Sequence, residues 1–333
     1  MIFIKKYSEL EVEEIEKVQG KKVFLEENYY NYINSEGGDV WYAMDNNYIL
    51  PIVISKKRGF YYASFPCETC VIENGKEKVQ EVEFLDEVQK ILKKNGIAWT
   101  ISSASALFDI YPSYSRRIPF GSHVIDLTKP EDEIWGRVHS KHRNSIRRAE
   151  KNDVKVKFGR EELLKDYIIL DNATWKRSGR KSYGNIFFKN ILASLKNNTI
   201  IFVAYKDGLP QAGACIFYNK EMGYYMYGAS ADRPEAGSAN YLQWEIIRYL
   251  KGEGVKSYSF VGCRINEDKD SKYHDIQRFK ERFGGMLIQG YMFKTILSPW
   301  KYHVFCFAYR IKHGNLFMDP IEQEISKWKE LNS

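Results

Sequence analysis

The chain has 333 residues, a formal net charge of +7 at neutral pH, and a composition that is 44% hydrophobic and 15% aromatic. This length exceeds what one hydrophobic core usually serves, so we expect two domains. The mild basic excess favours acidic partners without requiring nucleic acid. No apolar run reaches the roughly 18 residues of a membrane span, and the N-terminus MIFIKKYSEL lacks a signal peptide's long apolar core, so we expect a cytoplasmic protein.

The cysteines and histidines form no recognisable disulfide or metal pattern. The five cysteines are odd in number and scattered, which is a poor disulfide framework. Cys67 and Cys70 form a lone C-x-x-C, and neither a second pair nor an H-E-x-x-H motif accompanies it. We therefore predict no metal and no redox cofactor.

The first half of the chain predicts a strand meander, then a helix and another strand. Residues 40–65 contain three short apolar segments separated by turn-forming residues at 45–47 and 56–59. An amphipathic helix at 84–94 ends at Gly96, and a strand follows.

The second half repeats this order. Strands over 200–230 precede a helix and a strand within 238–262, with a glycine stop at Gly254. Two further helices, expected within 162–179 and 187–198, come before the strands. We predict two mixed α/β units, each a mostly antiparallel sheet flanked by helices.

The densest cluster of cations lies at residues 137–151. Its basic residues, against the single acid Glu150, are Arg137, Lys141, Arg143, Arg147, Arg148 and Lys151. Val138, His142, Ile146 and Ala149 share one helical face, so we predict an amphipathic helix docked by this seam, with His142 packed rather than catalytic. The cations form either a solvated face or an anion-binding surface, in which Arg143 and Arg147 would contact phosphate or carboxylate.

The C-terminal segment is expected to return to the first domain. YMFKTIL at 291–297 and KYHVFCFAYRI at 301–311 both look strand-like and need a sheet to join. We place the first domain at 1–127, completed by 290–333, and the second at 128–289.

Three motifs carry a resemblance to a known family. They are K-x-R-x-x-I-R-x-A-E-K-x-x-V at 141–154, YGAS at 227–230 and RFKERFGG at 278–285. Together with the repeated order of elements, they resemble the Fem family, the aminoacyl-tRNA-dependent transferases that build peptidoglycan cross-bridges on a tandem GNAT fold. The resemblance implies two tandem GNAT-like domains and acyltransferase activity. Many Fem proteins carry a coiled-coil arm in the second domain, and the absence of a sustained heptad run here predicts an armless member.

The resemblance also directs attention to one loop. The GNAT loop Q/R-x-x-G-x-G/A cradles the pyrophosphate of acyl-CoA at a helix N-terminus. The matching place here, Arg233-Pro-Glu-Ala-Gly-Ser-Ala, is one residue too long and has one glycine. This argues against ordinary acetyl-CoA chemistry, and Gly237 and Ser238 are either phosphate contacts or a turn with a helix cap.

Candidate substrate-binding residues lie on and around the predicted strand that contains YGAS at 227–230. Because no nucleophilic serine or cysteine signature is present, we expect direct attack without an acyl-enzyme. Asp232 is either the base or a turn-capping residue, and we assign no base. The resemblance implies that an arginine and tyrosines hold a nucleotide or lipid diphosphate, although an exposed basic loop would look the same. These candidates are Arg177, Arg180, Tyr183 and Tyr227.

Lys280 is the candidate catalytic residue. Phe279 and Phe283 are spaced to anchor one helical face, and Lys280 lies one step round from it. Spacing alone allows a surface lysine covering an aromatic pair. The resemblance instead implies that this lysine takes part in catalysis by supporting charge at the reacting ester.

The resemblance to the Fem family implies transfer of an amino acid from aminoacyl-tRNA to an amino group of a UDP-linked or lipid-linked peptidoglycan precursor. A peripheral contact with the inner membrane surface is also expected. A second hypothesis is N-acylation of an amino sugar or polysaccharide precursor from acyl-CoA or acyl carrier protein. A third, non-enzymatic hypothesis is nucleic-acid binding through the basic helix.

Overall fold

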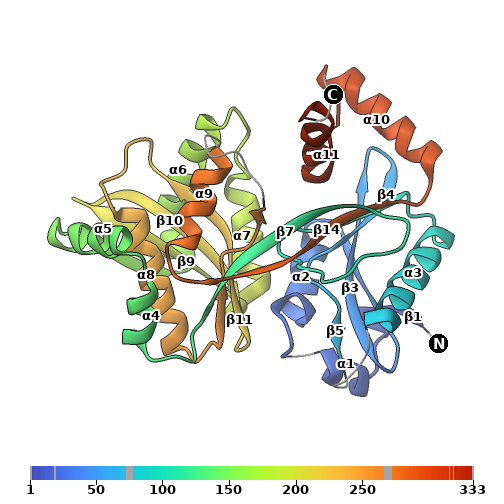
Figure 1. Cartoon of the computed structure of the whole chain (residues 1–333), viewed down its shortest axis with the longest axis horizontal. Helices are drawn as coiled ribbons and strands as arrows, with labels where there is room; N and C mark the ends of the chain where they lie inside the picture. Colours follow the sequence, from blue (N-terminus) through green and yellow to red (C-terminus); the bar gives the residue numbers. More distant parts are fainter. Residues whose placement is uncertain are drawn as a thin grey trace. The chain divides into compact units, whose positions relative to one another are not determined.

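The computed structural model describes residues 2–18, 20–72, 78–265, 272–314, 316–317 and 319–331. The chain divides into two compact units, and most of their elements are labelled in Figure 1. Unit 1 contains Met1–Gln19, Glu36–Gly121 and Gln289–Ser333, and unit 2 contains Gly20–Ser35 and Ser122–Ile288. The segment Gly20–Ser35, which sequence order grouped with the first domain, therefore belongs to the second unit.

The sheet of unit 1 has the strand order β1-β2-β3-β4-β6-β14. The bounds are β1 Phe3–Lys6, β2 Asp39–Met44, β3 Tyr48–Lys57, β4 Phe60–Phe65, β6 Trp99–Ser102 and β14 Met286–Ile296, with a short β5 at Cys70–Val71 beside β3. Neighbouring strands are antiparallel except β4 and β6, which are parallel because the helix α3 (Lys78–Lys94) connects them. The other helices of this unit are α1 Val12–Val18, α10 Pro299–His313 and α11 Pro320–Leu331.

The sheet of unit 2 has the order β7-β12-β11-β10-β9-β8. The bounds are β7 Arg116–Asp126, β8 Lys155–Gly159, β9 Thr199–Lys206, β10 Leu209–Tyr218, β11 Met222–Ser230 and β12 Ser257–Ser259, and β13 (Cys263–Arg264) pairs with β7 off this path. Here β11 and β12 are the parallel pair, joined through α8 (Ser238–Gly252). The remaining helices are α2 Glu27–Ser35, α4 Glu131–Arg137, α5 Ser140–Lys151, α6 Glu161–Arg177, α7 Gly184–Leu195 and α9 Lys272–Glu281.

Both units therefore show the predicted order of meander, helix and parallel strand. In each, Gly96 or Gly254 has a positive φ just after the helix, +81° and +74° respectively, which ends the helix as expected. The expected helices at 162–179 and 187–198 are confirmed as α6 and α7.

The two faces of the unit 2 sheet are covered by different helices. On β10, Ala212, Ala214 and Ile216 belong to the core that includes α8. Gly213 faces the other way, where a Cβ would lie 2.9 Å from the ring of Tyr167 on α6. The alternation along one strand thus packs the sheet between α8 on one side and α6 on the other.

The predicted strand at 301–311 is wrong, because these residues form helix α10. Pro299 stands at its first turn and Gly314, with φ of +71°, ends it. Tyr302 and Phe305 are buried and Tyr309 packs beside them, so the inward face follows helical spacing. The aromatic and β-branched composition, which favours strands, concealed this pattern.

The basic run is also divided differently from the prediction. α4 ends at Arg137 and α5 begins at Ser140, so one continuous helix over 137–151 is wrong. The apolar seam is nonetheless confirmed, since Val138, His142, Ile146 and Ala149 are all buried. No described helix exceeds the 17 residues of α3 and α6, and none of them combines the length and hydrophobicity needed to cross a bilayer.

Candidate active site

The end of α9 is anchored by aromatic packing, as the sequence predicts. The rings of Phe279 and Phe283 lie 5.3 Å apart, and the imidazole of His142 on α5 contacts both, at 5.2 and 4.8 Å. Nε2 of His142 is 3.0 Å from the carbonyl oxygen of Phe279, and burial lowers the pKa of this histidine to about 4. His142 is therefore a neutral packing residue that fixes α9 against α5.

The turn after α9 depends on glycine. Gly284 has a φ of +77°, and a Cβ at this position would lie 2.5 Å from the carbonyl oxygen of Arg137. A side chain here would both strain the backbone and collide with the end of α4. Gly284 thus allows the close approach that places α9 beside the α4–α5 junction.

Lys280 is buried, with 9% of its surface exposed, so it is not the surface lysine that spacing alone allowed. Its ammonium donates to the carbonyl oxygens of Val261 and Gly262, the latter at 2.7 Å. A lysine ammonium has three N–H donors, so one remains for another acceptor. The residue is therefore held in one orientation with one donor to spare.

The loop that holds Lys280 has an unusual backbone. Val261 and Gly262 both have positive φ values, +47° and +52°, a conformation that a β-branched residue rarely adopts. The hydroxyl of Ser259 accepts from the Val261 amide at 3.2 Å and lies 2.8 Å from the hydroxyl of Ser122. This hydroxyl pair supports the conformation that directs two carbonyls at one ammonium, and such strain is common at functional sites.

The environment of Lys280 keeps its side chain protonated at neutral pH while making the proton easier to transfer. Burial lowers the pKa of Lys280 to about 8, so the side chain is mostly protonated at neutral pH. Burial raises the pKa of the neighbouring Cys263 thiol to about 11, so this cysteine is a neutral thiol and a poor nucleophile. Burial also lowers the pKa of His123, so Lys280 is the cation of this cluster, and the Glu281 carboxylate lies near enough to act on His123 and Cys263.

Tyr183 and Tyr227 come together in a second cluster. Tyr183, at the start of α7, stacks on Phe187 at 4.6 Å and meets the ring of Tyr227 on β11 at 5.3 Å. The pairing of β10 with β11 shifts between Cys215 and Ile216, so Met226 forms a bulge beside Tyr227. Bulges often redirect side chains next to active sites, and no residue pattern in the sequence indicates this one.

The two arginines that follow α6 are placed differently. Arg177 donates to the carboxylate of Asp232 at 2.8 Å and to the Ser230 hydroxyl at 2.8 Å, which ties the end of α6 to β11. Asp232 is thus an ion-pair partner, and its role as a base stays a prediction. Arg180 is exposed and its charge acts on Tyr183, so it is the freer cation beside the tyrosine pair.

Arg143 and Arg147 serve the fold in the described contacts. The guanidinium of Arg143 donates to the carbonyl oxygens of Gly136, at 3.0 Å, and Val138, which are free at the end of α4. The guanidinium of Arg147 lies 5.5 Å above the Trp135 ring. Their role as substrate ligands stays a prediction.

The loop before α8 is closed by α5. Gly237 has a φ of +87°, and a Cβ there would lie 2.2 Å from the carbonyl oxygen of Ser145. The carboxylate of Glu235 in the same loop accepts from the Asn152 side chain at 2.8 Å. Gly237 therefore allows α5 to pack closely against this loop and acts as the helix cap of α8, and the loop carries an acidic residue.

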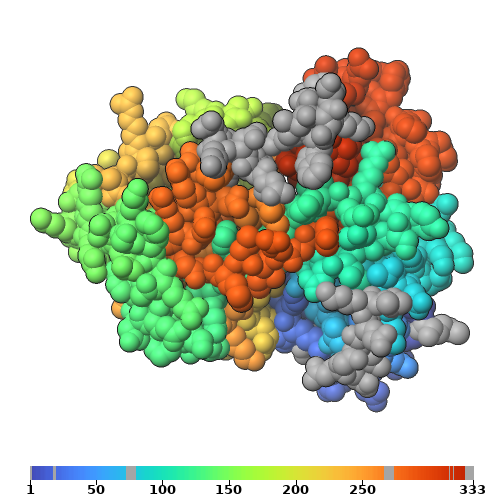
Figure 2. Space-filling model, in the orientation of Figure 1, coloured from blue at the N-terminus to red at the C-terminus, as the bar shows by residue number. Residues whose placement is uncertain are grey.

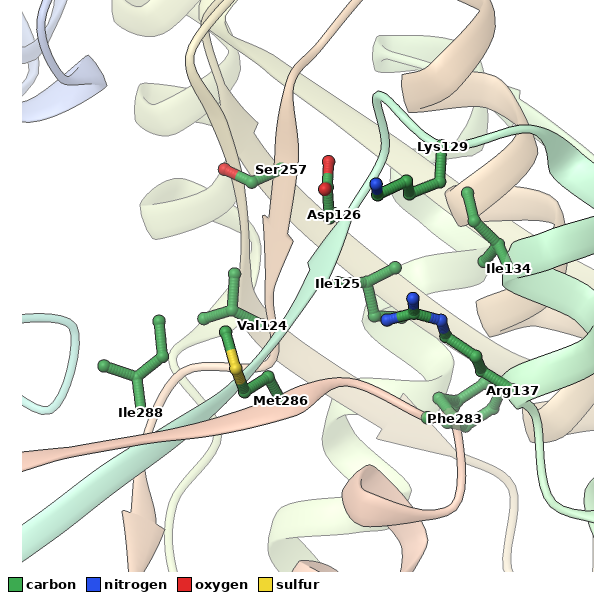
Figure 3. Close-up of a pocket in the computed structure, with 11 residues that line it drawn as sticks. Val124, Ile125, Asp126, Lys129, Ile134, Arg137, Ser257, Phe283, Met286 and Ile288 are labelled. Atoms are coloured by element: carbon green, nitrogen blue, oxygen red, sulfur yellow. The ribbon is translucent and has the colours of Figure 1, made fainter.

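A pocket of about 210 Å³ lies behind the turn that follows α9 (Figure 3). Its apolar wall includes Ile125, Ile134 and Phe283, and its charged groups are Asp126, Lys129 and Arg137. Arg137 is paired with Glu133 at 2.7 Å. The pocket therefore has mixed charge and no evident preference for an anion.

Comparisons with known proteins agree with the sequence motifs. Residues 136–280 match the family model described as the acetyltransferase (GNAT) domain. A lipid II:glycine glycyltransferase of Staphylococcus haemolyticus is 30% identical over 231 residues, which cover 49% of this chain and 55% of that protein. The chain thus matches about half the length of this relative.

Solved structures show the same architecture. A crystal structure of FemX superimposes with a TM-score of 0.63 at 15% identity, covering 83% of this chain and 92% of that one. A tandem GNAT protein from the clavulanic acid biosynthesis pathway superimposes with a TM-score of 0.50 at 9% identity, covering 90% and 99%. The duplicated meander-helix-strand unit, the GNAT family match and these structures agree that the chain has a tandem GNAT-like fold, and it is similar in sequence to part of a lipid II:glycine glycyltransferase.

Proposed function

We propose that this protein transfers an amino acid from aminoacyl-tRNA to an amino group of a peptidoglycan precursor, as a step in cross-bridge formation. The observation that carries the proposal is the buried, doubly held ammonium of Lys280, in a chain whose relative is named for glycyl transfer to lipid II. Peptidoglycan precursors present a diphosphate and free carboxylates, which suit Arg180 and the tyrosine pair.

The chemistry follows from the two bonds that change. The acceptor amine attacks the ester carbonyl carbon, a C–N bond forms, and negative charge develops on the carbonyl oxygen. The ester C–O bond then breaks, the leaving ribose oxygen takes up one proton and the attacking nitrogen gives up one, so the overall transfer neither consumes nor releases a proton. The remaining N–H of Lys280 supports one of these developing charges in a site from which water is largely excluded. Its lowered pKa reduces the cost of giving a proton to the leaving oxygen.

The closed loop before α8 supports a donor other than acyl-CoA. With Ser145 against Gly237 and Glu235 held nearby, the helix N-terminus offers no open cradle for a pyrophosphate. Acyl-CoA or acyl carrier protein on an amino sugar is the second candidate, and it requires a donor site elsewhere in the chain.

The test is single-turnover transfer with saturating labelled aminoacyl-tRNA and, separately, labelled acyl-CoA, each with lipid-linked or UDP-linked precursor. We expect product only with aminoacyl-tRNA. Lys280→Met should lower the rate about 10²-fold, the loss of about 3 kcal/mol typical of one such group. Arg278→Met removes an exposed cation from the same helix and should leave the rate unchanged. Normal rates in Lys280→Met would remove the lysine from the mechanism, and turnover with acyl-CoA would favour the second candidate.

A further inference from the structure

Helix α10 carries an exposed apolar face. Trp300, Val304, Phe307 and Ile311 are 64%, 48%, 67% and 71% exposed. Their spacing of four, three and four residues places them on one side of the helix, and they form what we call the apolar stripe. Single exposed apolar residues are ordinary, but four large ones in one row mark a binding surface.

The stripe is not the face that holds α10 on its unit. The opposite face packs Tyr302 and Phe305 against Trp99, at ring separations of 5.5 and 4.7 Å. Folding of unit 1 therefore already uses one apolar face of this helix and leaves the second free. In Figure 2 the orange-red atoms of α10 form part of the outer surface of the molecule.

The segment that contains the stripe has basic residues and no acidic ones. No aspartate or glutamate occurs from Pro299 to Met318. On the helix, the exposed Lys312 falls to one side of the stripe and the exposed Arg310 to the other. Long basic side chains on both sides of an apolar row are arranged to reach anionic groups above the surface while the row is buried.

The neighbouring β3–β4 hairpin adds to this charge. Arg58 donates to the carbonyl oxygen of Ala308 and its guanidinium lies 5.3 Å above the Tyr309 ring. The ammonium of Lys57 lies 4.8 Å from the centre of the Phe317 ring. These contacts fix the KKRG turn of the hairpin beside α10, so Lys57 and Arg58 add two basic residues next to this helix.

We infer that α10 lies in the interface of an anionic lipid bilayer, with the apolar stripe inserted among the acyl chains and the flanking cations at the phosphate level. At 15 residues α10 suits an interfacial position, where a large apolar face and basic flanks are the determinants of binding. A second copy of the chain fits less well, because the same face of the other copy would bring cations and no acidic residue from this segment to pair with them. The inference does not depend on the aminoacyl donor or on Lys280.

The first test is co-sedimentation of the full chain with vesicles of phosphatidylcholine alone or mixed with phosphatidylglycerol. We expect binding that requires phosphatidylglycerol and weakens with salt. Phe307→Ser combined with Ile311→Ser should lower the partition coefficient about 10-fold or more. The matched control, Tyr114→Ser with Leu209→Ser, removes two exposed apolar side chains that do not belong to α10 and should bind like the unmodified chain.

Charge is tested separately. Arg310→Gln with Lys312→Gln should lower binding to phosphatidylglycerol vesicles about 10-fold, since each cation near an anionic surface contributes appreciably. Lys93→Gln with Lys94→Gln, an exposed pair on α3, should lower it much less. Circular dichroism and unfolding midpoints of all four variants should match the parent, because every substituted side chain is largely exposed.

The position of the helix is tested by fluorescence. Lipids brominated on the acyl chain should quench tryptophan emission, and Trp300→Phe should remove most of that quenching among the seven tryptophans. Equal vesicle binding by the stripe variant and its control, or no binding by the unmodified chain, would overturn the inference. So would a dimer in light scattering that the stripe variant abolishes while vesicle binding stays the same.

Discussion

At the scale of single residues, the buried ammonium of Lys280 lowers the free energy of unfolding at neutral pH. Burying an ammonium costs free energy that two carbonyl hydrogen bonds offset only in part, which is why its pKa falls to about 8. A methionine would fill similar space without that cost. The lysine therefore carries a cost that a purely structural role would not require.

This cost has a measurable pH dependence. Between pH 8 and 10.5 the folded chain holds fewer protons at Lys280 than the unfolded chain, so the free energy of unfolding should rise with pH across this window. Relative to Lys280→Met, the unmodified protein should gain about 3 kcal/mol between the two ends of the window. Urea unfolding of both proteins at a series of pH values measures this, and parallel curves would contradict it.

Activity should respond to the same titration with the opposite sign. If the ammonium supports the reacting ester, kcat falls as pH rises through about 8, where Lys280 loses its proton. The residual rate of Lys280→Met should lack this descending limb. Cys263→Ser should keep it, because the pKa of that thiol is raised to about 11 and it does not titrate there. A limb that disappears in the cysteine variant would assign it to the thiol.

The sequence identifies some of these residues and not others. Phe279, Lys280 and Phe283 are found by spacing and motif, because an aromatic pair at one helical turn predicts its own packing. The carbonyls of Val261 and Gly262 cannot be found this way, since every residue has a carbonyl and only the backbone conformation directs it. The same limit hides the partners of Arg143, which are also carbonyls.

At the scale of elements, the basic run is a joint between two helices as well as a charged surface. The α4–α5 corner exposes the last carbonyls of α4, and Arg143 from the next helix donates to them. Arg143 is therefore one cation of this run with a structural role at the corner.

Arg143→Ala should therefore destabilise the fold. Leaving the α4 carbonyls without this charged donor should cost about 1–3 kcal/mol. Arg148→Ala, which removes an exposed cation from the same helix, should change stability by less than about 0.5 kcal/mol. Chemical unfolding measures the free energy of unfolding of both variants. Equal losses in the two would mean that the hydrogen bonds of Arg143 add nothing beyond the loss of one positive charge.

Helix α10 is the element that the sequence pattern wrongly predicts as a strand. Its apolar residues lie on two faces of the helix. Tyr302 and Phe305 are on the buried face, and Phe307 and Ile311 are on the exposed face. With both faces filled, the period of 3.6 residues is no longer visible, and the aromatic content favours a strand. The proline before it and the glycine after it were the better indicators.

At the scale of the whole molecule, each unit has its own core and its own buried polar group. In unit 1 the ammonium of Lys294 on β14 is fully buried and contacts the Tyr302 hydroxyl at 2.9 Å, Asp319 at 2.8 Å and Glu322. The ion pair with Lys294 lowers the pKa of Glu322 against the opposing effect of burial. These contacts fasten α11 to the sheet of this unit.

Lys294→Met should weaken unit 1 in particular. Removing one partner leaves two carboxylates with no buried counter-charge, which typically costs about 3–5 kcal/mol. Limited proteolysis followed by mass spectrometry should show earlier cleavage within Gln289–Ser333 and unchanged protection of α6 and α8. Lys301→Met, a half-buried lysine of the same segment that contacts the Gly96 carbonyl at 3.2 Å, is the matched control. Uniform cleavage of both units would show that they unfold together.

The division of unit 1 into separate stretches of chain also sets an order of events during synthesis. Strand β6 pairs with β4 on one side, but its other neighbour, β14, is translated nearly 200 residues later, when unit 2 is already complete. Until then β6 is an open edge, and Trp99 lacks the aromatic rings of α10 that bury it. While unit 2 folds on the ribosome, the nascent chain therefore has an incomplete unit 1 with an unpaired strand edge and exposed apolar surface. We expect its dependence on chaperones to be greatest in this interval.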